Sequence, residues 1–160
     1  MSWNKKGVSI LKRVTPDPGW PQSWRHSYLY DLEEVYGQLS NFGYAYAYQN
    51  RRDHTLALIN EVLSPGARIL DMAAAQGNFS IALAEQGYEV TWNDLRADLE
   101  GYVAAKHEFG SIRYAPGNAF ELQFEHLFDA VLITEVIEHV AHPDEFLRNA
   151  SSLVRPGGYI

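Results

Sequence analysis

The chain has 160 residues, of which 46% are hydrophobic and 13% aromatic, so it can bury one compact core. A formal charge of −7 disfavours general nucleic-acid binding, and the absence of cysteine excludes disulfides, thiolate nucleophiles and cysteine-ligated zinc. The longest apolar runs are far shorter than a membrane span and no apolar signal core opens the chain, so we expect a cytoplasmic protein without a membrane span.

The N-terminal part lacks a clear period. Residues 1–26 are rich in proline, which predicts an irregular arm, and aromatic side chains recur among polar ones over residues 28–48. Apolar residues with helical spacing begin only at residue 51 and predict a helix over residues 51–63. We therefore expect an N-terminal arm, residues 1–50, ahead of a domain formed by residues 51–160.

After this helix, short apolar or β-branched runs alternate with helical stretches. Strands are expected at residues 68–72, 88–94, 111–115 and 128–135, and helices at residues 78–87, 97–110 and 142–154. Such alternation predicts an α/β fold with a doubly wound, mostly parallel sheet. The last residues, LVRPGGYI, predict a Pro-Gly-Gly turn before a fifth strand that has only begun. We expect the C-terminal strands to be missing, and a dimer partner or a missing C-terminal segment to complete the sheet.

The sequence DMAAAQGNF, residues 71–79, follows the first predicted strand and leads into a helix. Small residues at such a turn let backbone N–H groups approach a ligand, and the start of the helix adds a positive dipole. The alternative is a tight turn that binds nothing. An acid at Asp71 would repel a pyrophosphate, and glycine occurs only at Gly77, so a nicotinamide dinucleotide fits poorly.

Asp94 follows the second predicted strand. A carboxylate at this position can accept hydrogen bonds from both hydroxyls of a ribose, as it does in many nucleotide-binding sheets. Taken alone, it could also be an exposed aspartate in a turn. The loop at residues 71–79 and Asp94 together indicate a nucleoside-containing ligand more strongly than either does alone.

With these features in place, the chain resembles the class I S-adenosylmethionine-dependent methyltransferases of the small-molecule or lipid-quinone type. The resemblance is carried, in order, by ILDMAAAQGNF, VTWNDL, APGNAFEL, FDAVLITEVIEHV and LVRPGGYI. It runs from about Arg68 to Ile160 and implies a Rossmann-like methyltransferase fold. It also implies that the aromatic segment within residues 1–50 is a lid over the substrate, although these rings could instead pack on the edge of the sheet.

The resemblance also implies a role for each matching residue. Asp71 anchors the end of the cofactor that carries the methionine amino group, and Asp94 binds the ribose. Asn118 stands where relatives usually have an aspartate that contacts adenine. The remaining implied cofactor residues are Ala73 and Gly77, which line the methionine end, Ala119, which gives a backbone contact, and Thr134, which lies beneath the methionine part.

Arg52 stands at roughly the place where some relatives pair an arginine with the methionine carboxylate. Arg51 competes for this role, and both could equally be exposed arginines at the start of a helix.

The sequence EVIEH at residues 135–139 has three interpretations. His139 could act as the general base or contact the substrate, because its intrinsic pKa suits proton transfer near neutral pH. Glu135, Glu138 and His139 could instead bind a divalent metal, as a similar cluster does in small-RNA 2′-O-methyltransferases. The third interpretation is a structural histidine. We expect no metal, with the three-residue cluster as the alternative.

These features predict an enzyme that transfers a methyl group from S-adenosylmethionine to a small-molecule oxygen, nitrogen or carbon nucleophile, leaving S-adenosylhomocysteine. One alternative is a non-catalytic cofactor-binding or regulatory module, because alanine replaces the usual glycine at Ala73 and Ala75. Another is a metal-assisted RNA 2′-O-methyltransferase, which the acidic charge disfavours. An alanine forced to positive φ costs about 1 kcal/mol or more, so weakened rather than abolished binding is expected.

Overall fold

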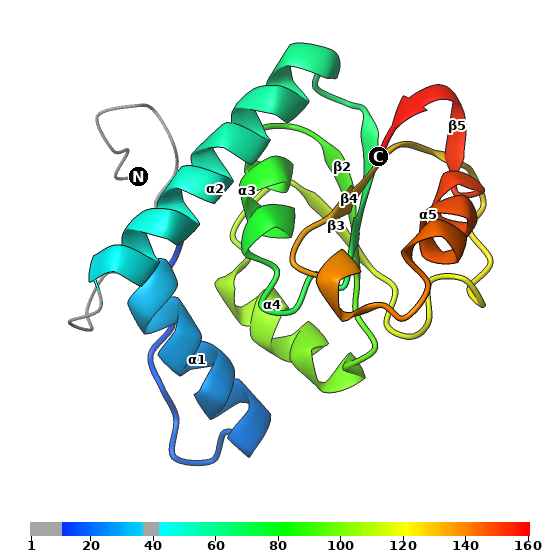
Figure 1. The fold of residues 1–160 in the computed structure, drawn as a ribbon. Helices are drawn as coiled ribbons and strands as arrows, with labels where there is room; N and C mark the ends of the chain where they lie inside the picture. The colour runs from blue at the N-terminus through cyan, green and yellow to red at the C-terminus, as the bar shows by residue number, and fades with distance from the viewer. Residues whose placement is uncertain (1–10, 37–41) are drawn as a thin grey trace.

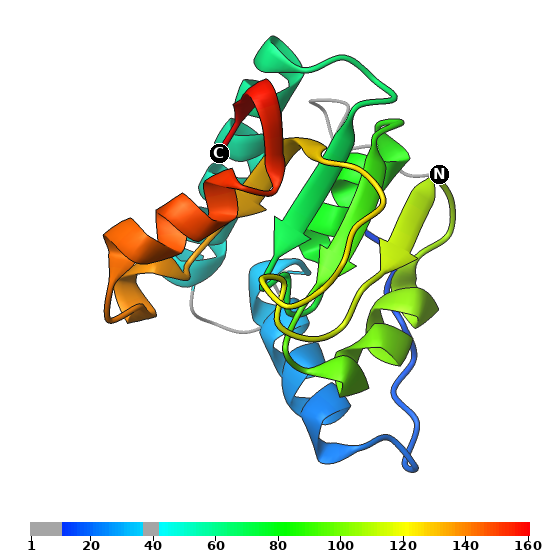
Figure 2. The same ribbon diagram turned by 90° about the vertical axis from the view of Figure 1, so that its right-hand side faces the viewer.

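The computed structural model describes residues 11–36 and 42–160, so the first ten residues of the predicted arm lie outside the described part. The core is a five-stranded parallel sheet in the order β3-β2-β1-β4-β5, as predicted. Figure 2 looks onto this sheet, whose green and yellow-green strands point in the same direction. The strands are β1 (Arg68–Met72), β2 (Glu89–Asn93), β3 (Ser111–Tyr114), β4 (Phe128–Ile133) and β5 (Val154–Tyr159).

The helices cover both faces of the sheet (Figure 1). They are α1 (Gln22–Glu34), α2 (Phe42–Val62), α3 (Asn78–Glu85), α4 (Glu100–Lys106) and α5 (Pro143–Ser151), with 3-10 turns η1 (Ala97–Leu99) and η2 (Ile137–His139). Helix α5 packs on one face, and α2, α3 and α4 lie on the other. Within the described ranges, no helix has the length and apolarity that a membrane crossing requires.

The central strand β1 is buried on both faces, which suits its apolar residues Ile69, Leu70 and Met72, and the acid Asp71 is buried with them. Ile69 packs in a cluster with side chains of α2 and α3, whereas Leu70 and Met72 pack in a cluster that includes Ala150 of α5. Strand order reverses between β1 and β4, because the chain first builds outward through β2 and β3 and then returns to the other side. Ligands of such sheets bind at this reversal, beyond the carboxyl ends of the strands.

The expectation of an irregular arm over residues 1–26 is wrong at its end, because α1 already begins at Gln22. Helix α2 likewise begins at Phe42, well before the predicted residue 51. The buried residues of α1 are Ser27, Tyr28, Asp31 and Glu34. Their spacing is helical, but all four are polar or amphipathic, so a search for apolar periodicity passes over the helix. The division at residue 50 stays a prediction, and α2 runs through it.

The C-terminal segment differs from its prediction, because Pro-Gly-Gly lies inside β5 rather than before it. The register between β4 and β5 shifts between Phe128 and Ala130, which accommodates the extra residues as a bulge. Asp129 fastens this edge: its carboxylate accepts from the Arg68 N–H of β1 at 2.7 Å and from the Arg155 guanidinium of β5. These donors lower the pKa of Asp129, with the Arg155 hydrogen bond as the largest cause.

Candidate functional site

The loop between β1 and α3 has a left-handed backbone at three positions: φ is 55° at Ala73, 44° at Ala75 and 67° at Gly77. Two of these positions are therefore alanines in a conformation that glycine adopts more easily. Gly77 has no room for a side chain, since an added Cβ would lie 2.6 Å from Cγ1 of Val103. The loop thus keeps the shape expected of a glycine-rich turn, with one glycine at its tightest point.

The end of β2 holds this loop in place. The backbone N–H of Ala74 donates to the carbonyl of Asn93 at 2.9 Å, and that of Ala75 donates to Oδ2 of Asp94 at 2.9 Å. The indole of Trp92, which is fully buried, donates to the carbonyl of Ala75 at 3.1 Å. A strained backbone persists only where its surroundings determine it, and these three bonds do so here.

Asp71 and Asp94, the two predicted acids, have different surroundings. Asp71 is 1% exposed, and the hydroxyl of Ser80 donates to its Oδ2 at 2.5 Å. Burial raises the pKa of Asp71 to about 7; the Ser80 bond opposes this rise, and the charge of Asp94 adds to it. Asp71 therefore supports the loop from below instead of facing a ligand.

Asp94 is 8% exposed and accepts from two backbone N–H groups, those of Ala75 and Arg96, at 2.9 and 2.8 Å. A carboxylate has about four acceptor positions, so Asp94 retains capacity for the two hydroxyls of a diol. Its position is that of the ribose-binding acid in nucleotide-binding sheets.

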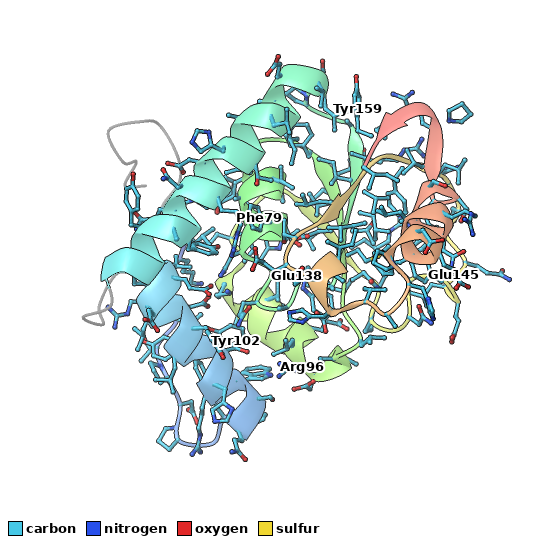
Figure 3. All side chains as sticks on the ribbon, viewed as in Figure 1. Phe79, Arg96, Tyr102, Glu138, Glu145 and Tyr159 are labelled. Carbon is cyan, nitrogen blue, oxygen red and sulfur yellow. The ribbon has the colours of Figure 1, made fainter. Side chains whose placement is uncertain are left out.

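Beside the loop lies a pocket of about 230 Å³ at the reversal between β1 and β4. It brings together two predicted residues, Ala73 and Thr134, with Phe79, which Figure 3 shows next to α2. The predicted residues Gly77, Asp94, Asn118 and Ala119 are not among its lining residues. The pocket is lined by Glu34, Tyr48, Arg51, Ala73, Ala74, Ala75, Gln76, Asn78, Phe79, Thr134 and Glu135.

Of the two arginines at the helix, Arg51 lines the pocket and Arg52 does not. Nη1 of Arg51 lies 2.7 Å from Oε1 of Glu135, whereas Arg52 is 7% exposed and pairs with Asp53 at 3.2 Å. Tyr48, one turn before Arg51, is 5% exposed and also lines the pocket. The sequence placed Tyr48 only in the aromatic segment of the implied lid, and its spacing from Arg51 indicates a place in the pocket wall once the helix is extended to Phe42.

Nε of Arg51 in this wall is buried without a hydrogen-bond partner in the described structure. The Arg51 guanidinium lies over the Tyr48 ring, 5.5 Å from its centroid, and burial raises the pKa of Tyr48, so its hydroxyl stays protonated. A buried guanidinium nitrogen without a partner suits an anionic group, such as a carboxylate, in the pocket.

The loop after β3 lies beside Asp94, because the Gly117 N–H donates to the carbonyl of Asp94 at 2.8 Å. Asn118 uses its side chain locally: Oδ1 accepts from the Phe120 N–H at 3.1 Å and Nδ2 donates to Glu121 at 2.8 Å. Ala119 is 4% exposed and belongs to the core cluster under α5. The structure thus brings the predicted adenine residues next to the predicted ribose residue.

The EVIEH segment follows β4, and its last three residues form η2. Glu135 has φ 57° and is paired with Arg51, while Glu138 lies 3.9 Å from His139. The His139 side chain is 77% exposed. In the part of the chain that the structure describes, no three or more histidine, aspartate or glutamate side chains are grouped so as to hold a metal ion.

Residues 44–160 match the family model described as a methyltransferase domain. The chain belongs to this methyltransferase family. It is 32% identical over 177 aligned residues to the ubiquinone biosynthesis O-methyltransferase of Rickettsia conorii, with 98% of this chain and 61% of that protein covered. The chain therefore spans less than two thirds of that relative's length.

Solved methyltransferases have the same fold. Phosphoethanolamine N-methyltransferase 2 of Haemonchus contortus, in complex with S-adenosyl-L-methionine, has a TM-score of 0.56 at 26% identity and covers 66% of this chain and 26% of its own. The N-methyltransferase NodS of Bradyrhizobium japonicum, with bound S-adenosyl-L-homocysteine, has a TM-score of 0.63 and covers 86% and 70%, and at 16% identity it shows the fold alone. The predicted class I, Rossmann-like methyltransferase fold is confirmed.

The left-handed alanines give a first prediction. Ala73→Gly and Ala75→Gly each remove a strained Cβ at positive φ, which stabilises the fold by about 1 kcal/mol before the entropy of glycine in the unfolded chain is subtracted. Each change should leave the free energy of unfolding unchanged or raise it. The control Ala104→Gly, at an exposed position within α4, should lower it by about 1 kcal/mol. Urea denaturation compares them, and equal losses in all three variants would contradict the strain.

Asp71 gives a second prediction, on pH. Its folded-state pKa of about 7 lies above the unfolded value, so the folded state holds an extra proton between about pH 4 and 7. The stability that Asp71 contributes is therefore present below about pH 4 and is lost as pH rises through 7, on the order of 4 kcal/mol in total. Asp71→Asn should remove this decline, measured as the difference in unfolding free energy between variant and wild type.

Asp129→Asn is the comparison for Asp71, because the pKa of Asp129 is lowered. Its contribution is present above the unfolded pKa of about 4 and is lost as pH falls through the lower folded value, which is the opposite sign. A difference curve for Asp71→Asn that is flat from pH 4 to 7 would show that Asp71 is not a buried acid of raised pKa.

Proposed function

We propose that this chain binds S-adenosylmethionine and transfers its methyl group to a small-molecule nucleophile. The observation that carries the proposal is the left-handed β1–α3 loop, held by Asp94 beside a pocket at the strand reversal. The methyltransferase relatives support it, since one is a ubiquinone biosynthesis O-methyltransferase and another was solved with S-adenosyl-L-methionine.

The residues present fit this cofactor. We assign the methionine end to the pocket, where Ala73 and Thr134 line the wall, and the ribose to Asp94. The methionine carboxylate is assigned to Arg51, whose Nε has no partner in the described structure and which lines the pocket, in preference to Arg52, which is buried against Asp53. Adenine is assigned to the loop of Asn118 and Ala119, and Asp71 and Gly77 shape the loop from beneath.

S-adenosylmethionine supplies an already activated methyl group, so the protein mainly aligns the acceptor atom with it and excludes water. Within the small-molecule class, we favour a phenolic hydroxyl acceptor, because the ubiquinone biosynthesis relative aligns over 98% of this chain. A phenol loses a proton as it is methylated, and His139 is the last residue of η2, four residues after Glu135 of the pocket wall. We assign His139 as the general base.

Cofactor binding is tested by calorimetric titration of the folded chain with S-adenosylhomocysteine. Asp94→Asn removes the charge that would accept the ribose hydroxyls, which is worth about 1.5 to 3 kcal/mol, so affinity should fall roughly 10- to 100-fold. The control Asp98→Asn changes an exposed acid of the neighbouring η1 and should leave affinity unchanged. No heat at millimolar ligand would remove the proposed function, and unchanged affinity in Asp94→Asn would remove the ribose assignment alone.

The base is tested separately with catechol as acceptor. His139→Gln should leave the affinity for S-adenosylhomocysteine unchanged and lower kcat by about 100-fold, since loss of a general base typically has this size. The control His142→Gln, at the residue that precedes α5, should change neither value. Unchanged kcat in His139→Gln would remove the base assignment, and absence of methyl transfer to catechol by a wild-type chain that binds the cofactor would remove the phenolic acceptor.

A further inference from the structure

A fully buried polar cluster joins α1, α3 and α4 behind the candidate site. Nζ of Lys106 lies 2.8 Å from Oδ2 of Asp31, and both side chains are 0% exposed. The hydroxyl of Tyr102 donates to the same Oδ2 at 2.6 Å, and Figure 3 shows this ring between α1 and α4. The fourth member is Asn78, the first residue of α3.

Asn78 is held at both ends of its amide. Its Nδ2 donates to Oδ1 of Asp31 at 2.7 Å, and its Oδ1 accepts from Nζ of Lys106 at 2.7 Å. The orientation of the amide is thus fixed by one acceptor from α1 and one donor from α4. Asn78 directly follows Gly77 and itself lines the pocket, so the cluster reaches the cofactor loop through a single residue.

A buried ion pair is a costly way to gain stability alone. Removing two charges from water requires several kcal/mol per ion, and apolar replacement of such pairs is often neutral or stabilising. Burial lowers the pKa of Lys106, while the Asp31 charge opposes that shift. Apolar side chains at the positions of Asp31 and Lys106 could not form hydrogen bonds to both ends of the Asn78 amide.

The end of the loop that leads into α3 must be held by residues outside β2. Bonds from β2 fix Ala74 and Ala75, but they do not reach the junction between Gly77 and α3. Gly77, which has a left-handed backbone, forms that junction, and Asn78 is the next residue in the chain.

We propose that Asp31 and Lys106 are positioning residues that hold the amide of Asn78 and thereby set the shape of the cofactor loop. The proposal rests on the proposed function for its effect on cofactor affinity. Its structural part, the restraint of the loop, holds whether or not the cofactor is S-adenosylmethionine. It also makes α1 part of the site, since Glu34 of the same helix lines the pocket.

The test replaces the polar cluster with apolar groups of similar size, Asp31→Leu with Tyr102→Phe and Lys106→Met, leaving Asn78 without its partners. The urea midpoint should stay close to that of the wild type. The affinity for S-adenosylhomocysteine should fall at least tenfold, and amide hydrogen exchange at Gly77, whose N–H donates to the carbonyl of Ala74 at 2.8 Å, should become at least tenfold faster without ligand. The control Lys12→Met removes an exposed lysine, 3.8 Å from Glu108, and should change none of these values.

A stable triple variant with wild-type affinity and wild-type exchange would overturn the proposal, leaving the cluster a structural feature. If the triple variant does not fold, Asn78→Ala gives the same decision, because it keeps the Asp31–Lys106 pair and removes only the amide. Unchanged exchange at Gly77 in Asn78→Ala would then overturn it. If the wild type binds no S-adenosylhomocysteine, the proposed function fails, while the exchange measurement still decides the positioning role.

Discussion

A left-handed backbone at Ala73 and Ala75 is the constraint on which the rest of the site depends. Each alanine is less stable in this conformation than glycine would be, so the surroundings must offset the difference. They do so from the end of β2, where Asp94 and Trp92 bond to both backbone groups of Ala75. The order of strands is therefore part of the site, because β2 must lie beside β1 for these bonds to form.

Among the buried carboxylates near this loop, Asp71 and Asp31 have partners that differ with their roles. Asp71 has a hydroxyl donor and no cation, so burial dominates and its pKa rises. Asp31 has an ammonium, an amide and a phenol as donors, which satisfy both of its oxygens. An acid that supports a turn can be neutral, whereas an acid that orients an amide and a lysine works through its charge.

The sheet could be predicted from sequence because its central strands β1 and β2 are short, largely apolar runs that are buried along most of their length. The Asp71 loop and Asp94 could be predicted because parallel strands bring their carboxyl ends together. Helix α1 could not, because its buried face is Ser27, Tyr28, Asp31 and Glu34, and the pattern of a polar core does not stand out. Arg51 was a candidate from the sequence, but its pairing with Tyr48 in one wall was not, since it required the helical period to extend back to Phe42.

Helix α1 and the predicted site residues lie on different sides of the start of the family match. The family model matches residues 44–160, which hold the loop, Asp94 and the EVIEH segment, while α1 precedes the match. Yet α1 supplies Glu34 to the pocket and Asp31 to the cluster behind it. A helix that precedes the family match therefore closes the same pocket. Because Glu34 lines the pocket while Asp31 bonds to the amide of Asn78, α1 acts on the pocket both directly and through the first residue of α3.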